Sequence, residues 1–131
     1  MEQLRTSVAL RRGPAKAFLV FGRMLAPAQV EGIATERWQE GGHDHQIPAV
    51  FHAAWRAPDG RLGVVLTNWT TAPQTVILRD PRLGERVVLH LAGERMTRLS
   101  HTVGVEGLTV TVPPLGSALV EQPTGEERAL P

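Results

Sequence analysis

Two apolar runs joined by a tight turn constrain this chain more than any other feature. The runs are residues 49–56 and 62–69, and the turn between them is Pro58-Asp59-Gly60. Proline pre-sets φ at the first corner, aspartate bonds to the local backbone, and glycine takes the left-handed conformation that starts the second strand in register. The β-branched and aromatic content disfavours the alternative, a buried helix broken by Pro58. Both faces carry apolar side chains, so we expect a central antiparallel hairpin that is covered on both sides.

Size and charge exclude several classes of protein. A chain of 131 residues with 42% hydrophobic and 21% charged residues suits a single globular domain. Its 14 Lys and Arg residues are scattered along the sequence and balanced by 13 Asp and Glu. Phosphate binding needs a concentrated basic stripe, so we expect no nucleic-acid partner. The absence of cysteine excludes disulfides and thiolate chemistry.

Targeting signals are also missing from the sequence. No apolar run approaches the ~20 residues that span a bilayer, and Met1 leads into no signal-peptide core. We therefore expect no membrane partner, and a cytoplasmic location if these residues are the full chain. The triplet Asn68-Trp69-Thr70 matches a glycosylation sequon, which we treat as chance in the absence of a secretory signal.

The chain divides into three segments. Residues 1–25 are expected to form a short helix that ends near Gly13-Pro14, followed by an apolar lead-in at residues 17–25 that suits either helix or strand. The lead-in is too apolar to stand alone in water, so it must pack on the sheet or on something outside this chain. Residues 26–122 are the expected β-sandwich, and residues 123–131 are a polar, frayed tail.

Short strands separated by turn residues follow the central hairpin. We expect them at residues 74–79, 86–91, 96–101, 108–112 and 117–121. Residues 31–46 lack a period and are interpreted as a long loop, with a strand near residues 33–38; loops of this length tend to be functional or mobile. The pattern predicts an all-β fold, an antiparallel β-sandwich of about seven to eight short strands with a short N-terminal helix.

Three passages, taken in order, carry a resemblance. They are Phe18-Leu19-Val20-Phe21-Gly22-Arg23-Met24-Leu25-Ala26-Pro27, then Trp55-Arg56-Ala57-Pro58-Asp59-Gly60 running into Leu66-Thr67-Asn68-Trp69, and a close formed by residues 108–112, Pro113-Pro114 and Ser117-Ala118-Leu119-Val120. Their order, from about Phe18 to Glu121, resembles the C-terminal β-sandwich domain that follows the catalytic (β/α)8 barrel in several glycoside hydrolase families.

The resemblance implies a non-catalytic accessory domain of a glycosidase-like protein. Such a domain would pack on and stabilise a catalytic barrel, with the barrel or another protein partner contacting residues 17–25. Residues 1–25 would then include a remnant of the last barrel helix. In such enzymes the paired carboxylates lie on barrel strands, so no catalytic residue can be carried over to this chain. We expect no enzymatic activity from the chain alone and no cofactor.

The residues themselves offer no catalytic constellation. Glu36, Glu40 and Asp44 show no spacing that would place an acid pair across a sugar. Ser100 and Ser117 lack the strand-turn-helix context of a nucleophile elbow.

A metal site is a weak alternative. His43, Asp44 and His45, with His52 nearby, could offer imidazoles and a carboxylate to a metal ion. Zinc needs three or four ligands in fixed geometry, and His-x-His in a loop is more often a polar exposed segment. We therefore expect no metal.

The second functional hypothesis is a free-standing carbohydrate- or protein-binding β-sandwich module that uses the loop at residues 31–46. Its candidate ligand-binding residues are Trp38, His43, Asp44 and His45. Trp38 is the aromatic expected to be exposed, whereas Trp55 and Trp69 lie within expected strands and favour core packing. The lead-in discriminates between the two hypotheses, because a large exposed apolar patch there would mean that a partner is missing.

Overall fold

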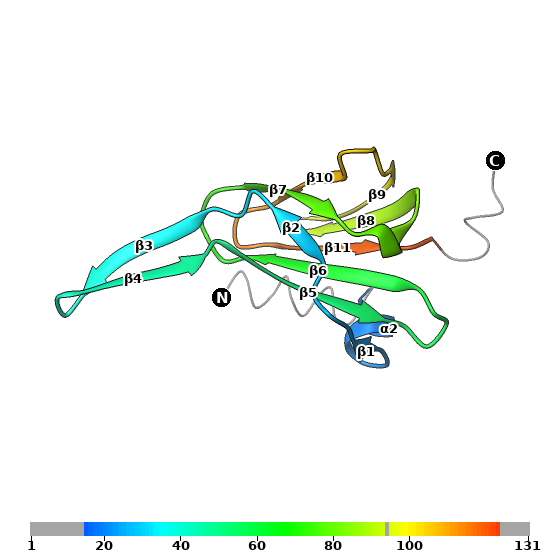
Figure 1. Ribbon diagram of the computed structural model, residues 1–131, viewed down its shortest axis with the longest axis horizontal. Coiled ribbons are helices and arrows are strands. Elements are labelled where there is room, and N and C mark those ends of the chain that lie inside the picture. The colour runs from blue at the N-terminus through cyan, green and yellow to red at the C-terminus, as the bar shows by residue number, and fades with distance from the viewer. Residues whose placement is uncertain (1–14, 94, 124–131) are drawn as a thin grey trace.

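The computed structural model describes residues 15–93 and 95–123. The helix predicted near residues 1–12 and the tail beyond Pro123 lie outside the described residues, and Pro123 itself is buried. The described part is nearly all β, with eleven strands in three antiparallel sheets and the layered arrangement of a sandwich (Figure 1). The predicted antiparallel β-sandwich is confirmed, with more strands than expected.

One layer of the sandwich is a six-stranded sheet. In spatial order its strands are β1 (Arg23–Met24), β5 (Val50–Arg56), β6 (Leu62–Asn68), β11 (Ser117–Glu121), β8 (Arg86–Ala92) and β9 (Met96–Thr102). The predicted hairpin is its β5–β6 pair, in a register that runs from Val50 opposite Asn68 to Arg56 opposite Leu62. Gly60 has φ of 90°, and the Ala57 amide donates to the Arg61 carbonyl over 2.9 Å, so the turn closes as its sequence predicts.

The second layer is a three-stranded sheet that packs on the first. Its strands are β10 (Leu108–Val112), β7 (Gln74–Arg79) and β2 (Gln29–Glu31), and the short helix η1 (Pro81–Leu83) follows β7. Alternating side chains of both layers meet in one apolar core. Its buried members include Val64, Leu66, Val76, Leu78, Leu89, Val110, Ala118 and Val120.

The lead-in packs partly on the outer face of the six-stranded sheet. It forms the short helix α2 (Lys16–Leu19) and then β1, so the run that suited either helix or strand contains both. Phe18 of α2 is fully buried in a second, smaller apolar cluster with Trp55 and Leu119. A Cβ at Gly63 would lie 2.7 Å from the Phe18 ring, so the glycine makes room for that ring.

The third sheet is a hairpin that projects from the sandwich (Figure 1). It consists of β3 (Thr35–Glu40) and β4 (His43–Pro48), so the predicted long loop at residues 31–46 was wrong. Gly41 and Gly42 have φ of 59° and 81°, the conformation of a two-residue hairpin turn. Most of its side chains are exposed on both faces, so its sequence lacks the apolar alternation that marks a half-buried strand.

Candidate functional site

The β3–β4 hairpin has two chemically different faces. Trp38 lies opposite His45, and Gln39 lies opposite Asp44. Successive side chains of a strand point to opposite sides, so the register sorts the residues into two sets. We call one set the aromatic face, which consists of Glu36, Trp38, Glu40, His43, His45 and Ile47. The other set, the polar face, includes Arg37, Gln39, Asp44 and Gln46.

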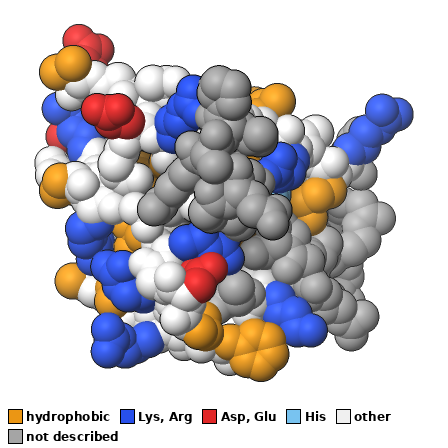
Figure 2. Space-filling view, turned by 90° about the vertical axis from the view of Figure 1, so that its right-hand side faces the viewer, with side chains coloured by type: hydrophobic (Ala, Val, Ile, Leu, Met, Phe, Trp, Pro, Cys, Tyr) orange, Lys and Arg blue, Asp and Glu red, His pale blue; other side chains and the backbone are white. Residues whose placement is uncertain are grey.

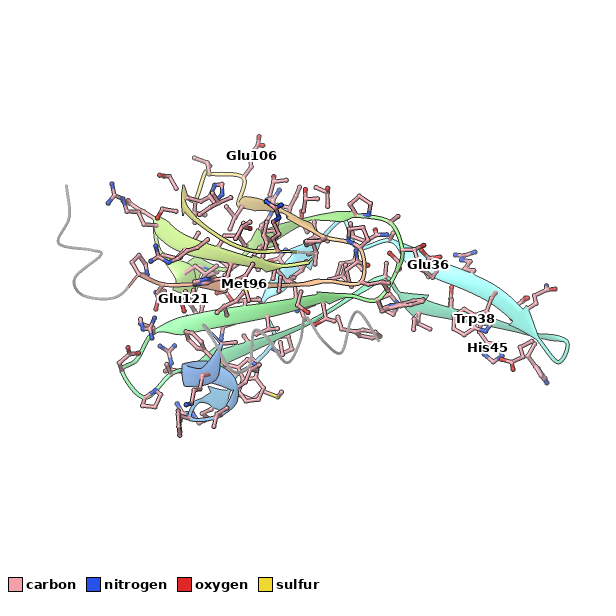
Figure 3. The ribbon with its side chains drawn as sticks, turned by 180° about the vertical axis from the view of Figure 1, so that it is seen from behind. Glu36, Trp38, His45, Met96, Glu106 and Glu121 are labelled. Atoms are coloured by element: carbon pink, nitrogen blue, oxygen red, sulfur yellow. The ribbon has the colours of Figure 1, made fainter. Side chains whose placement is uncertain are left out.

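The aromatic face centres on a cross-strand ring pair. The rings of Trp38 and His45 are stacked, with centroids 5.3 Å apart and planes 21° from parallel, and Figure 3 shows them side by side on the hairpin. Trp38 remains 41% exposed and belongs to neither apolar cluster, as expected from the sequence. Trp55 and Trp69 are half-buried, and the Trp69 Nε1 donates to the Pro48 carbonyl at the base of the hairpin.

The polar face borders a depression of about 480 Å³. Its lining residues are Arg37, Trp38, Gln39, Asp44, His45 and Gln46. Gln39 Nε2 donates to Asp44 Oδ1 over 2.8 Å, so these two polar groups satisfy each other. The lining therefore combines residues of both faces, with the Arg37–Gln46 and Gln39–Asp44 pairs from the polar face and the Trp38–His45 pair from the aromatic face.

The structure does not bring the four candidate metal-binding residues together. Asp44 points away from His43 and His45, because side chains alternate along β4. His52 lies on β5, on the side that faces the sandwich core. Across residues 15–93 and 95–123 no group of three His, Cys, Asp or Glu side chains is placed to hold a metal ion.

His52 offers a prediction on pH. Its Nδ1 is buried without a hydrogen-bond partner, and burial lowers the pKa of the ring below its ordinary value. At a pH between the lowered pKa of the folded state and the ordinary value of about 6.5, the unfolded chain binds more protons at His52 than the folded chain does. The contribution of His52 to stability is therefore complete above pH about 6.5 and falls as the pH drops below that value. His52→Leu should flatten this part of the dependence of the unfolding free energy on pH, measured by urea denaturation. The same change at His101, which is exposed, is the control, and an equal flattening there would contradict the assignment.

A buried charged cluster lies on the outer face of the six-stranded sheet. Glu121 accepts from His90 Nε2 at 3.2 Å and lies 3.4 Å from Arg61 Nη1. The Arg61 guanidinium also pairs with Asp59 and lies 5.4 Å from the centre of the Phe18 ring. Arg61 thus connects the charged cluster to the buried Phe18 ring. Its members come from distant parts of the chain, and no sequence signal singled them out.

Three exposed apolar side chains of the lead-in form a second candidate site. Val20, Phe21 and Met24 are 45%, 62% and 60% exposed, and we call them the lead-in surface. They lie beside α2 and β1, at one edge of the six-stranded sheet (Figure 1). The lead-in is thus divided, because Phe18 packs on the sheet whereas Val20, Phe21 and Met24 face solvent.

At the end of the molecule away from the hairpin, the visible described residues form no concentrated patch of one charge. In Figure 2, the visible Lys and Arg side chains of the described residues lie among neutral, apolar and acidic ones. None of the helices among the described residues is long and apolar enough to cross a membrane.

Similarity to known proteins is found among solved structures. No protein-family model matches the chain, and no curated protein matches it. Among solved structures, the chain is similar to the GH51 arabinofuranosidase from Xanthomonas axonopodis pv. citri, at 20% sequence identity and a TM-score of 0.38. The match covers 66% of this chain and 21% of the arabinofuranosidase, so the chain spans about a fifth of that enzyme.

Proposed function

We propose that this chain is a non-catalytic accessory β-sandwich domain of a glycosidase-like protein, which packs on a catalytic barrel and stabilises it. The observation that carries the proposal is the lead-in surface. Val20, Phe21 and Met24 are exposed within five residues of chain, directly after the buried Phe18. Covering apolar area is favourable by about 25 cal/mol per Å², so a protein surface of matching shape would gain from docking there.

Asp59 and Asp80 do not have the character of a glycosidase acid. A glycosidase acid needs a raised pKa, so that it holds a proton near neutral pH. Burial acts to raise the pKa of Asp80, but hydrogen bonds from Arg82 outweigh it and hold the pKa below its ordinary value. Burial likewise acts to raise the pKa of Asp59, but the hydrogen bonds and charge of Arg61 together hold that pKa below its ordinary value. Both groups suit ion pairs better than proton donation.

The experiment begins with the native protein, detected in its source cells by an antibody raised against this chain. We expect a species large enough to include a barrel. A species of the size of this chain alone would contradict the proposal.

A double substitution then tests the lead-in surface itself. Phe21→Ser with Met24→Ser should change the unfolding free energy of the isolated chain by less than about 0.5 kcal/mol, because both side chains are exposed. In the full-length protein it should lower the melting temperature of the barrel by several degrees, as read by calorimetry. Val105→Ser is the matched control, since Val105 is fully exposed in the β9–β10 loop. An unchanged barrel transition in the double variant would overturn the docking assignment.

A second candidate function is ligand binding by the β3–β4 hairpin, as a carbohydrate- or protein-binding module. The observation that favours it is the placement of Trp38, which is exposed on a projecting element outside both apolar clusters. This function needs no barrel and uses a different surface.

A further inference from the structure

We propose that the aromatic face of the β3–β4 hairpin binds a segment of a neutral glycan, with the Trp38 indole as the platform for a sugar ring. The proposal rests on the second candidate function and names its site and its class of ligand. It is independent of the lead-in surface.

The first argument is that the indole has no structural role in the sandwich. Trp38 is absent from both apolar clusters, and its one ring contact is with His45 on the neighbouring strand. The stack on His45 is a cross-strand pair that stabilises the hairpin, but the sandwich core does not use the indole, so its exposed area remains open to a ligand.

The second argument is that the platform is held in place before a ligand arrives. The stack with His45 restricts the orientation of the indole. The two residues lie directly opposite each other in the β3–β4 pairing, which keeps their rings together. Because the Trp38 side chain is already restricted in the free protein, it loses less conformational entropy when a ligand binds. The negative face of an aromatic ring attracts weakly positive C–H groups, which line the faces of sugar rings.

The third argument is the polarity around the platform. Glu36 and Glu40 lie two positions before and after Trp38 on the same face, which places them roughly 7 Å away along the strand. Their carboxylates can accept hydrogen bonds from hydroxyl groups on either side of a stacked ring, and the His43 imidazole adds a ring nitrogen across the strands.

Charge narrows the class of ligand further. The same two carboxylates repel phosphate and sulfate groups, so nucleic acids and anionic polysaccharides do not suit this face. A cation would be attracted, but sites for cationic side chains commonly enclose them between several rings, whereas this face is open. An open platform with hydroxyl-binding groups on both sides suits a neutral polymer that lies across it.

The experiment is affinity electrophoresis of the 131-residue chain in native gels that contain xylan, mixed-linkage β-glucan or linear arabinan, each in a separate gel. We expect at least one polysaccharide to retard the chain, and Trp38→Ala to weaken that binding about tenfold or more. Trp38→Tyr, which retains an aromatic ring, should keep most of it. Phe51→Ala is the matched control, because Phe51 is an exposed aromatic residue on the sandwich, and it should bind like the parent chain.

Three outcomes would overturn the proposal. The first is no retardation by any of the three polysaccharides, and the second is retardation that Trp38→Ala leaves unchanged. The third is Trp38-dependent binding to polylysine without binding to the neutral polysaccharides, which would identify a cationic partner instead. All three leave the docking proposal intact, because that proposal depends on Phe21 and Met24 in the full-length protein.

Discussion

Phe18→Ala should lower the free energy of unfolding of the chain by about 3–5 kcal/mol, as measured by urea denaturation. Phe18 is fully buried against Trp55 and Leu119, on the face of the sheet away from the main core. The substitution removes the apolar contacts of the ring and leaves a cavity beside Gly63, whose missing side chain had made room for the ring. Arg61 loses its ring neighbour at the same time.

The control is the same substitution at Phe21, which lies on the exposed side of the lead-in. Phe21→Ala should change the unfolding free energy by less than about 0.5 kcal/mol, because the Phe21 side chain is 62% exposed. Similar losses for Phe18→Ala and Phe21→Ala would contradict the division of the lead-in into a buried anchor and an exposed surface.

Most strands of the sandwich could be predicted from the sequence. Residues 74–79, 108–112 and 117–121 are the bounds of β7, β10 and β11, and those expectations are confirmed. These strands bury one or both faces, so their apolar residues follow a period of two or form a continuous run. The turn at Pro58-Asp59-Gly60 carried the same kind of local information, because its residue types specify its backbone.

The strand expected near residues 33–38 overlaps β3, but β4 and the pairing of the two strands as a hairpin were not predicted. The patterns that identify a strand record burial, and β3 and β4 bury almost nothing. The one local signal was Gly41-Gly42, a pair that suits a two-residue hairpin turn and that we interpreted as part of a loop. Turn chemistry is therefore more informative than periodicity where a hairpin leaves the body of a domain.

The role of Trp38, His43, Asp44 and His45 in binding stays a prediction, and their arrangement in space could not be read from the sequence. Trp38 was expected to be exposed because it was placed in a Gly-rich loop; it is 41% exposed, but it lies on strand β3. The stack on His45 depends on the β3–β4 register, which brings together residues seven apart. The same register separates Asp44 from His43 and His45, so three consecutive residues that looked like one cluster point to two faces.

Asn68 ties the two layers of the sandwich together where β6 ends. Its Nδ2 donates to the carbonyls of Ala72, Val112 and Pro113 at 2.8, 3.1 and 3.1 Å, and its Oδ1 accepts from the Thr70 amide and hydroxyl. The side chain thus joins the end of β6 to the segment that leads into β7 and to the end of β10. It is fully buried, so the sequon at this position is not open to glycosylation in the folded protein.

Asn68→Ala should lower the free energy of unfolding by about 3–5 kcal/mol, because it leaves several buried backbone groups without a partner. Asn68→Asp separates shape from hydrogen bonding. It keeps the acceptor for Thr70 but turns the donating amide into a carboxylate that faces three carbonyl oxygens, so a loss at least as large as that of alanine is expected at neutral pH. Thr71→Ala, three residues along and exposed, is the matched control and should change stability by less than about 0.5 kcal/mol. Urea denaturation of the three variants provides the measurement. A loss below about 1 kcal/mol for Asn68→Ala would mean that water replaces the amide at this corner, and that the two layers are held by the apolar core alone.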